Sequence, residues 1–332
     1  MNGNRELLEG PRDCSAGLPK PYFRTTLGAA YHGKAEELLG SLPDESISLI
    51  FTSPPYALHF KKDYGNVDQD QYVEWFLGFA AEFRRVLKPD GSLVVNLGGS
   101  WQPGRPVRSL CHFEVLIRLV REYAFHLAQE FFWYNPAKLP APAEWVTVRR
   151  IRVKDAVEAL WWLAKSTQPK ADNRQVLTEY SDDMKRLLKR GYRPKERPSG
   201  HRITHKFTEQ AGAIPPNFLS LGNNDSNGHY LKRCAEAKLK PHPARFPAGL
   251  PEFFIRFLTS EGDTILDPFA GSCTTGEAAE RLHRRWMGFE VRADYLDCAQ
   301  FRFENGSLVL EASQSPVTPR SASAQQAEMA LF

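Results

Sequence analysis

Short apolar runs alternate with amphipathic stretches along most of this chain. The runs at 44–52 (DESISLIFT) and 91–99 (GSLVVNLGG) predict buried β-strands. The segment 71–91 between them has helical periodicity and ends in KPDG, so it predicts an amphipathic helix that closes there. The same pattern predicts a helix at 113–123 and strands at 127–135 and 157–165. Strands that alternate with crossover helices indicate an α/β fold with a doubly wound, mostly parallel sheet.

The two ends of the chain and one central segment lack this periodicity. Residues 1–20 predict a flexible arm, and residues 311–332, rich in Ser, Ala, Gln and Pro, predict a disordered tail. Residues 166–240 are rich in Pro, Gly, Asn and His and predict an insertion used for recognition. We therefore expect two halves of one α/β domain, 21–165 and 241–310, with that insertion between them.

Composition narrows the class of protein. The chain has 332 residues, 42% of them hydrophobic, which is enough for a sizeable core. No run approaches the roughly 18 apolar residues of a membrane span, and the N-terminus lacks the basic and then apolar pattern of a signal peptide. The five cysteines are scattered without a CxxC pair, so no metal is expected. We expect a cytoplasmic protein without a membrane segment.

Positive charge is concentrated in the middle of the chain. The net charge is only +4, but residues 147–206 contain sixteen Lys and Arg against seven Asp and Glu. Such an excess is typical of a solvated charged face and also of a surface that binds nucleic acid. Charge alone does not decide between the two.

The strand predicted at 44–52 runs directly into Ser53-Pro54-Pro55-Tyr56. Two successive prolines hold the backbone extended and remove two amide donors. The Ser53 hydroxyl and the Pro54 carbonyl are therefore acceptors at the end of a strand. The alternative is structural, with Ser53 capping a turn and Tyr56 packing against the core.

A second motif, DPFAGSCTTG, follows a predicted strand near the C-terminus and leads into a helix and another strand that ends in Glu290. Gly271 and Gly276 suit the tight turn that lets a ligand approach the backbone. Glu290 comes 23 residues after Asp267, about where an acid at a strand tip accepts hydrogen bonds from a ribose. The pattern indicates either a nucleoside site or an ordinary βαβ turn.

TSPPY followed by DPFAGSCTTG, with a basic segment between them, resembles the S-adenosylmethionine-dependent DNA amino-methyltransferases. These enzymes carry a (S/N/D)PP(Y/F) motif at the target amine and a (D/N)PF(A/G)GSGTT-like motif at the cofactor. The order seen here is that of the permuted beta group. The resemblance extends from Tyr31 to Arg302 and is greatest to cytosine-N4 enzymes, in DESISLIFTSPPYAL, FFWYNPAKLP, RPSGH and HPARFPAGLPEFFIR.

The resemblance implies a fold, a cofactor and a substrate. These are a circularly permuted, seven-stranded methyltransferase sheet, S-adenosyl-L-methionine, and duplex DNA from which one base is flipped. Serine at the first position of the target motif is usual for cytosine, so the expected activity is cytosine-N4 methylation within a restriction-modification system. Adenine-N6 methylation and a catalytically weakened DNA-binding relative are the alternatives.

The resemblance also implies a biological setting. A cognate restriction endonuclease is the expected functional, not physical, partner. The enzyme is expected to act as a monomer on nucleoid DNA in a prokaryotic cytoplasm. A palindromic recognition word containing GC, such as CAGCTG, follows from the resemblance alone.

An exocyclic amine is a poor nucleophile, and the resemblance implies that Ser53, Pro54, Pro55 and Tyr56 orient it toward the methyl group. Tyr56 is expected to offer a ring face to the flipped base, and Trp133 to form the opposite wall. The residues expected at the cofactor are Asp267, Phe269, Ala270, Gly271, Ser272, Thr274, Glu290, His242 and Phe246. The segment HPARFP, which contains the last two, is alternatively a stiff linker into a helix.

The resemblance assigns two groups of residues to DNA. The expected phosphate contacts are Arg149, Arg150, Arg152 and Lys154. The residues expected to read bases are Arg197, Ser199, His201 and Arg202. The alternative for this second group is a loop that only braces the sheet.

Two positions depart from the pattern of the family. Relatives commonly have an Asp that accepts from the adenine amino group, and this chain has Lys34 there. Asn96 occupies a position that is acidic in a similar cytosine-N4 enzyme. Asparagine keeps one acceptor but loses the charge. We still expect activity, because neither change removes the acceptors of the target motif.

Overall fold

The computed structural model describes residues 15–56, 68–190, 211–223, 227–304 and 308–309. Ten strands within them form one sheet, in the order β10-β1-β2-β9-β8-β3-β4-β6-β5-β7. The strands are β1 (Phe23–Thr25), β2 (Gly28–His32), β3 (Ile47–Thr52), β4 (Leu87–Leu97), β5 (His126–Tyr134), β6 (Val157–Ala164), β7 (Phe218–Ser220), β8 (Thr264–Asp267), β9 (Arg285–Glu290) and β10 (Leu308–Val309).

The predicted α/β sheet is confirmed, and its edges extend beyond the prediction. The seven expected strands correspond to the central run from β2 to β5, in which β2, β9, β8, β3 and β4 pair in parallel. β6 lies antiparallel between β4 and β5. Three short strands are additional: β1 and β10 beyond β2, and β7 beside β5.

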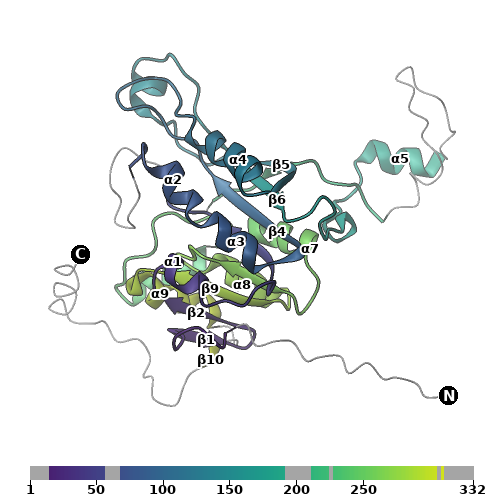
Figure 1. The fold of residues 1–332 in the computed structure, drawn as a ribbon. Coiled ribbons are helices and arrows are strands. Elements are labelled where there is room, and N and C mark those ends of the chain that lie inside the picture. The colour runs from purple at the N-terminus through teal and green to yellow at the C-terminus, as the bar shows by residue number, and fades with distance from the viewer. Residues whose placement is uncertain (1–14, 57–67, 191–210, 224–226, 305–307, 310–332) are drawn as a thin grey trace.

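Helices cover both faces of the sheet (Figure 1). One core is formed with α1 to α4 and the other with α7 to α9 and the 3-10 helix η4, while α6 packs against α9 and η4. The helices are α1 (Ala35–Leu39), α2 (Tyr72–Leu77), α3 (Ala80–Val86), α4 (Cys111–Glu122), η1 (Glu144–Val148), η2 (Asn173–Val176), α5 (Asp182–Arg190), α6 (Gly228–Glu236), α7 (Gly249–Leu258), α8 (Thr274–Arg281), α9 (Ala293–Ala299) and η4 (Gln300–Phe303).

Strand β3 lies at the centre of the sheet and is buried on both faces. Ile50 packs into the core of α1 to α4, whereas Leu49 and Phe51 pack into the core of α7 to α9. A strand covered on both sides needs apolar residues on both, which explains why Leu49, Ile50 and Phe51 follow one another. The position of the motif that follows β3 is therefore fixed by the core.

The helix predicted at 71–91 is wrong in its extent. The segment forms two helices, α2 and α3, and leaves the helical conformation at Leu87, whose ψ is 136°. The KPDG sequence then begins β4. A residue before proline favours extended backbone, so Lys88 cannot easily continue the helix, and the chain enters the strand earlier than expected.

Several predicted segments are only partly described. Residues 1–14 of the predicted arm and all of the predicted tail 311–332 lie outside the described residues. Within the rest of the arm, Leu18 packs against the first core. The described parts of the predicted insertion form η2, α5, β7 and α6, and α5 lies away from the sheet at the upper right of Figure 1. Within the described ranges, no helix has the length and apolar character needed to cross a membrane.

Candidate active site

The two sequence motifs lie side by side at one edge of the sheet. β3 and β8 are parallel neighbours, so their carboxyl ends meet. The Thr52 hydroxyl, at the end of β3, donates a 2.8 Å hydrogen bond to Asp267 Oδ1, at the end of β8. These residues are 215 positions apart in the chain. Ser53 therefore directly follows Thr52, the residue that is hydrogen-bonded to the second motif.

Asp267 is buried and holds the start of the second motif in place. Besides Thr52, it accepts from the Thr275 hydroxyl at 2.6 Å and from the Phe269 amide at 3.1 Å. The three hydrogen bonds lower the pKa of Asp267, but burial has the larger effect and raises it to about 6. Both oxygens already accept from the chain, so this carboxylate positions the turn and ties it to β3.

The turn after β8 depends on one glycine. Gly271 has a φ of +50°, in the left-handed region, and a Cβ there would lie 3.1 Å from the His242 ring. Its amide donates a 2.8 Å hydrogen bond to Glu290 Oε2. Cys273 then adopts a φ of 55° immediately before α8 begins at Thr274. The backbone therefore stays close to the tips of β8 and β9.

Glu290 is a buried acid at the tip of β9. Its second oxygen accepts from the Arg292 amide at 2.9 Å. Burial raises the pKa of Glu290 to about 7, and the nearby Asp267 and Asp294 add to this effect. A carboxylate oxygen with one hydrogen bond can accept a second one. Glu290 can thus receive hydroxyl groups while it holds the turn.

The remaining predicted cofactor residues surround this turn. The Ser272 and Thr274 hydroxyls are 3.1 Å apart, and Ala270 donates its amide to the Phe289 carbonyl. Phe269 packs edge-on against Phe79. These contacts hold Phe269, Ala270, Ser272 and Thr274 at the turn after β8.

The HPARFP segment lies against both motifs. The His242 ring packs edge-on against Tyr295, and its Nδ1 lies 2.6 Å from the Ala244 carbonyl. Burial and neighbouring arginines lower the pKa of His242 to about 4, so the ring is neutral near pH 7. Phe246 packs edge-on against Phe51 of β3. The segment therefore contacts the turn after β8 and the strand that leads into the target motif.

Arg302 lies outside the second motif and supports the turn after β8. No motif in the sequence indicated this residue. Its side chain is 1% exposed. It donates to the Ser272 carbonyl at 2.7 Å, to Glu277 at 2.8 Å and to Asn227 at 2.7 Å. The guanidinium also lies over the Tyr230 ring, 4.4 Å from its centroid. This buried cation fixes Ser272 from outside the motif.

The Tyr56 hydroxyl is the centre of a polar cluster at the target motif. It lies 2.9 Å from Asn96 Oδ1 and 2.8 Å from Glu158 Oε2. The Ser53 hydroxyl donates to it over 3.4 Å. Lys138 Nζ donates to the other Glu158 oxygen at 2.5 Å. Burial, and then the charge of Glu158, raise the pKa of Tyr56 well above its ordinary value, so the phenol keeps its proton.

No sequence pattern indicated Glu158 or Lys138. Glu158 is the second residue of the apolar strand β6, and Lys138 lies in the connection from β5 to β6, so neither has a local motif. Their contribution becomes visible only when β6 takes its place between β4 and β5. The Tyr56 ring also lies over Gly98, where a Cβ would come within 2.6 Å of the ring.

Trp133 does not form the wall that the sequence analysis expected. It is 5% exposed and packs in the core of α7 to α9, and its indole N–H donates to the Leu221 carbonyl at 2.9 Å. Side chains alternate between the faces of a strand, and this position on β5 points into the core. We do not assign Trp133 to the site.

The predicted phosphate contacts lie on one projecting connection between β5 and β6, at the upper left of Figure 1. Arg149, Arg150 and Lys154 are exposed. Arg152 is half-buried, with its guanidinium over Trp101, 3.8 Å from the ring centroid. The residues predicted to read bases, Arg197, Ser199, His201 and Arg202, lie outside the described residues.

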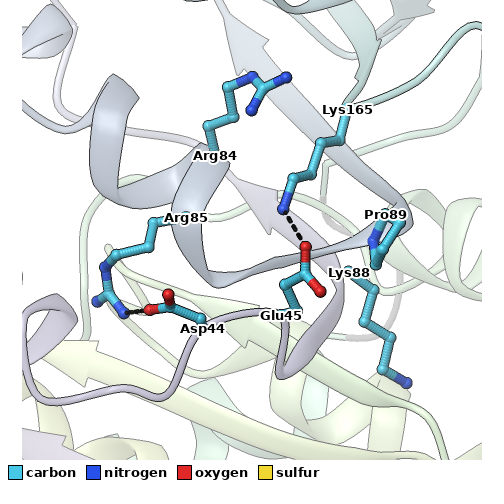
Figure 2. A pocket seen from close by; sticks show the side chains of 7 residues that line it. All are labelled: Asp44, Glu45, Arg84, Arg85, Lys88, Pro89 and Lys165. Carbon is cyan, nitrogen blue, oxygen red and sulfur yellow. Dashed lines mark hydrogen bonds and ion pairs between the residues drawn. The ribbon is translucent and has the colours of Figure 1, made fainter.

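Figure 2 shows a hollow at the opposite edge of the sheet, near the amino ends of β3 and β4. Four of its charged side chains form two ion pairs: Arg85 with Asp44 at 2.6 Å, and Lys165 with Glu45 at 3.1 Å. The two motifs lie at the carboxyl ends of the strands, so this hollow is not part of the site.

Several known proteins are similar to this chain over most of its length. A type II methyltransferase, M.PvuII of Proteus hauseri, is 52% identical over 293 residues, which cover 87% of each chain. M.ScaI of Streptomyces caespitosus is 28% identical, over 88% of this chain and 86% of its own length. The solved structure of PvuII DNA methyltransferase (cytosine-N4-specific) matches with a TM-score of 0.72 and 45% identity, over 90% of this chain and 92% of that one.

The fold also matches more distant structures. The S-adenosyl-L-methionine complex of TTHA0409 from Thermus thermophilus is 24% identical and has a TM-score of 0.52, over 86% of this chain and 99% of that one, which supports the fold alone. The N6/N4 methyltransferase family model, described as DNA methylase, matches residues 47–301. This match extends from the start of β3 to η4 and includes both motifs, so the chain belongs to the DNA methylase family.

Proposed function

We propose that this chain is a site-specific DNA methyltransferase that transfers a methyl group from S-adenosyl-L-methionine to the N4 amine of cytosine. One observation carries the proposal: the Thr52–Asp267 hydrogen bond, which sets the acceptors of the target motif beside the cofactor turn. The cytosine-N4 specificity of the PvuII enzyme, at 45% identity, supports cytosine-N4 over adenine-N6.

The residues at the tips of β8 and β9 fit a cofactor that contains a nucleoside. Glu290 offers one remaining acceptor position on each oxygen to the ribose hydroxyls, and Gly271 keeps the backbone free of a side chain. His242 and Phe246 close the site from the other side. When bound, S-adenosyl-L-methionine supplies a methyl group on a positively charged sulfur, which leaves as a neutral thioether.

The target motif supplies hydrogen-bond acceptors for the cytosine amine, which is a poor nucleophile. Pro54 and Pro55 donate no amide hydrogen, so the Ser53 hydroxyl and the Pro54 carbonyl accept from the two amine hydrogens. This orients the nitrogen toward the methyl group and stabilises the positive charge that develops as the N–C bond forms and the S–C bond breaks. The alkylated nitrogen becomes neutral again when it loses one of its two protons to water. Tyr56 then supports the flipped base at its ring.

The remaining assignments concern DNA and the cell. Arg149, Arg150, Arg152 and Lys154 hold phosphates, while Arg197, Ser199, His201 and Arg202 read bases. The enzyme acts as a monomer, because replication leaves hemimethylated sites in which only the new strand needs a methyl group. It works in a prokaryotic cytoplasm on nucleoid DNA, together with a cognate restriction endonuclease as its functional partner.

A labelling experiment tests the function. The protein is incubated with tritiated S-adenosyl-L-methionine and genomic DNA, and the DNA is digested to nucleosides. We expect the label in N4-methylcytosine. Label in N6-methyladenine would show that adenine is the target instead of cytosine. DNA binding without any label would indicate a catalytically weakened relative.

We expect the affinity for S-adenosyl-L-methionine to fall as the pH is lowered from about 8 to about 6. Protonation of a carboxyl group turns one acceptor oxygen into a donor and weakens its bond to the ribose. Burial raises the pKa of Glu290 to about 7, so the loss occurs around neutrality. Calorimetric titration at several pH values measures it.

Glu290→Gln is the control for this pH dependence. The amide binds the cofactor more weakly at every pH and does not titrate, so its affinity should change less between these limits. Asp267, with a pKa of about 6, titrates in both proteins, and the difference between them reports Glu290. Equal pH profiles for the two proteins would rule out this assignment.

A further inference from the structure

Three side chains converge on one phenol at the target motif. Tyr56 has a single hydroxyl proton, and both Asn96 Oδ1 and Glu158 Oε2 lie within 2.9 Å of its oxygen. The Ser53 hydroxyl approaches the same oxygen at 3.4 Å. A phenol donates one hydrogen bond and accepts up to two, so it cannot donate to both oxygens.

Glu158 is the stronger acceptor for that proton. Hydrogen bonds to an ionised carboxylate are shorter and about twice as strong as those between neutral groups. Asn96 Nδ2 is buried and has no hydrogen-bond partner among the described residues. If the amide is turned end for end, Nδ2 donates to the Tyr56 oxygen and the unpaired donor is satisfied. Each of the three neighbours then has a compatible role.

The carboxylate of Glu158 is held in place from its other side. Lys138 Nζ donates to Oε1 at 2.5 Å, and the Glu158 side chain is only 16% exposed. Glu158 pairs with Trp133 in the register of β5 and β6, so the core of the sheet fixes its backbone. Removal of the charge therefore changes the hydrogen bonding of Tyr56 without removing a core side chain.

We propose that Glu158 is a positioning residue for methyl transfer: it accepts the hydrogen bond of the Tyr56 hydroxyl, which keeps its proton, so that the Tyr56 oxygen accepts from Ser53 and leaves the Ser53 lone pairs for the substrate amine. The chain of donors runs from Ser53 to Tyr56 to Glu158 and ends at a negative charge. Glu158 thus supplies the charge that Asn96 lacks. This inference rests on the proposed function, which assigns Ser53 to the amine.

The direction of the chain explains its effect on the reaction. If Tyr56 instead donated to Ser53, one lone pair of the serine oxygen would be occupied. With the carboxylate present, the Ser53 proton points to Tyr56 and the oxygen faces the site as an acceptor.

Glu158→Gln tests the proposal, because it keeps the shape of the side chain and removes the charge. We expect kcat to fall about 10- to 100-fold, the range for losing a hydrogen bond to a charged group. The KM for S-adenosyl-L-methionine and the Tm should stay close to those of the wild type. Glu130→Gln, an exposed acid on the adjacent strand β5, is the matched control and should keep its kcat.

The double variant Asn96→Asp with Glu158→Gln returns a carboxylate to the other neighbour of the same phenol. We expect it to recover most of the lost kcat. A purely structural role for Glu158 predicts no recovery. Wild-type kcat in Glu158→Gln, or no rescue by the double variant, would overturn the proposal.

A second readout separates this inference from the proposed function. The hydroxyl proton of Tyr56, identified in NMR spectra by its loss in Tyr56→Phe, should move upfield in Glu158→Gln because a charge-assisted hydrogen bond is lost. An unchanged resonance contradicts the inference whether or not the protein methylates DNA. An active wild type that labels another base would contradict only the proposed function.

Discussion

Ser53→Ala is expected to reduce kcat for DNA methylation by about 10²–10³-fold, the usual effect of removing one group that stabilises developing charge. The change removes the hydroxyl acceptor for the cytosine amine and leaves the Pro54 carbonyl in place. The Ser53 hydroxyl bonds only weakly to Tyr56, at 3.4 Å, so its loss costs little stability. Transfer of tritium to DNA under saturating cofactor measures the effect.

The same variant should retain its affinity for S-adenosyl-L-methionine and for DNA, because neither depends on this hydroxyl. A loss confined to kcat identifies an interaction that is stronger in the transition state. Ser260→Ala is the matched control: this serine is exposed and precedes β8, at the edge of the sheet away from the motifs. A Ser53→Ala enzyme as fast as this control would eliminate the serine as an acceptor.

The parts of the site that follow strands could be predicted from the sequence. The apolar run before Ser53 and the one before Asp267 mark two buried strands, and buried parallel strands bring their carboxyl ends to one edge. The helix at α4 was also predicted to within two residues at its start. In these segments local periodicity and the final packing agree.

The parts that depend on neighbouring strands could not be predicted. Glu158 reaches Tyr56 only because β6 runs antiparallel to β4, and no local pattern indicates that pairing. Trp133 looked like a binding aromatic, but the register of β5 turns it into the core. The contacts of Arg302 come from three separate segments. Such long-range contacts are set by the fold as a whole.

Arg302→Met is expected to have the largest effect on stability and to weaken the cofactor site as well. The variant keeps an unbranched side chain but breaks the ion pair with Glu277 and the bonds to Ser272. Loss of one partner from a buried ion pair costs about 3–5 kcal/mol, because the remaining charge stays poorly solvated. Urea unfolding measures this loss, and calorimetry measures the weaker binding of S-adenosyl-L-methionine.

Arg233→Met distinguishes the buried cation from an ordinary surface one. Arg233 also makes two ion pairs, with Glu236 and Glu304, but its side chain is 34% exposed, so water replaces much of what is lost. We expect its unfolding midpoint to stay near that of the wild type. Excess S-adenosyl-L-methionine should raise the midpoint of Arg302→Met less than that of Arg233→Met, because at one concentration a ligand that binds the folded state more weakly stabilises it less. Equal midpoints for the two variants, with equal responses to the cofactor, would mean that the turn after β8 holds its shape without Arg302.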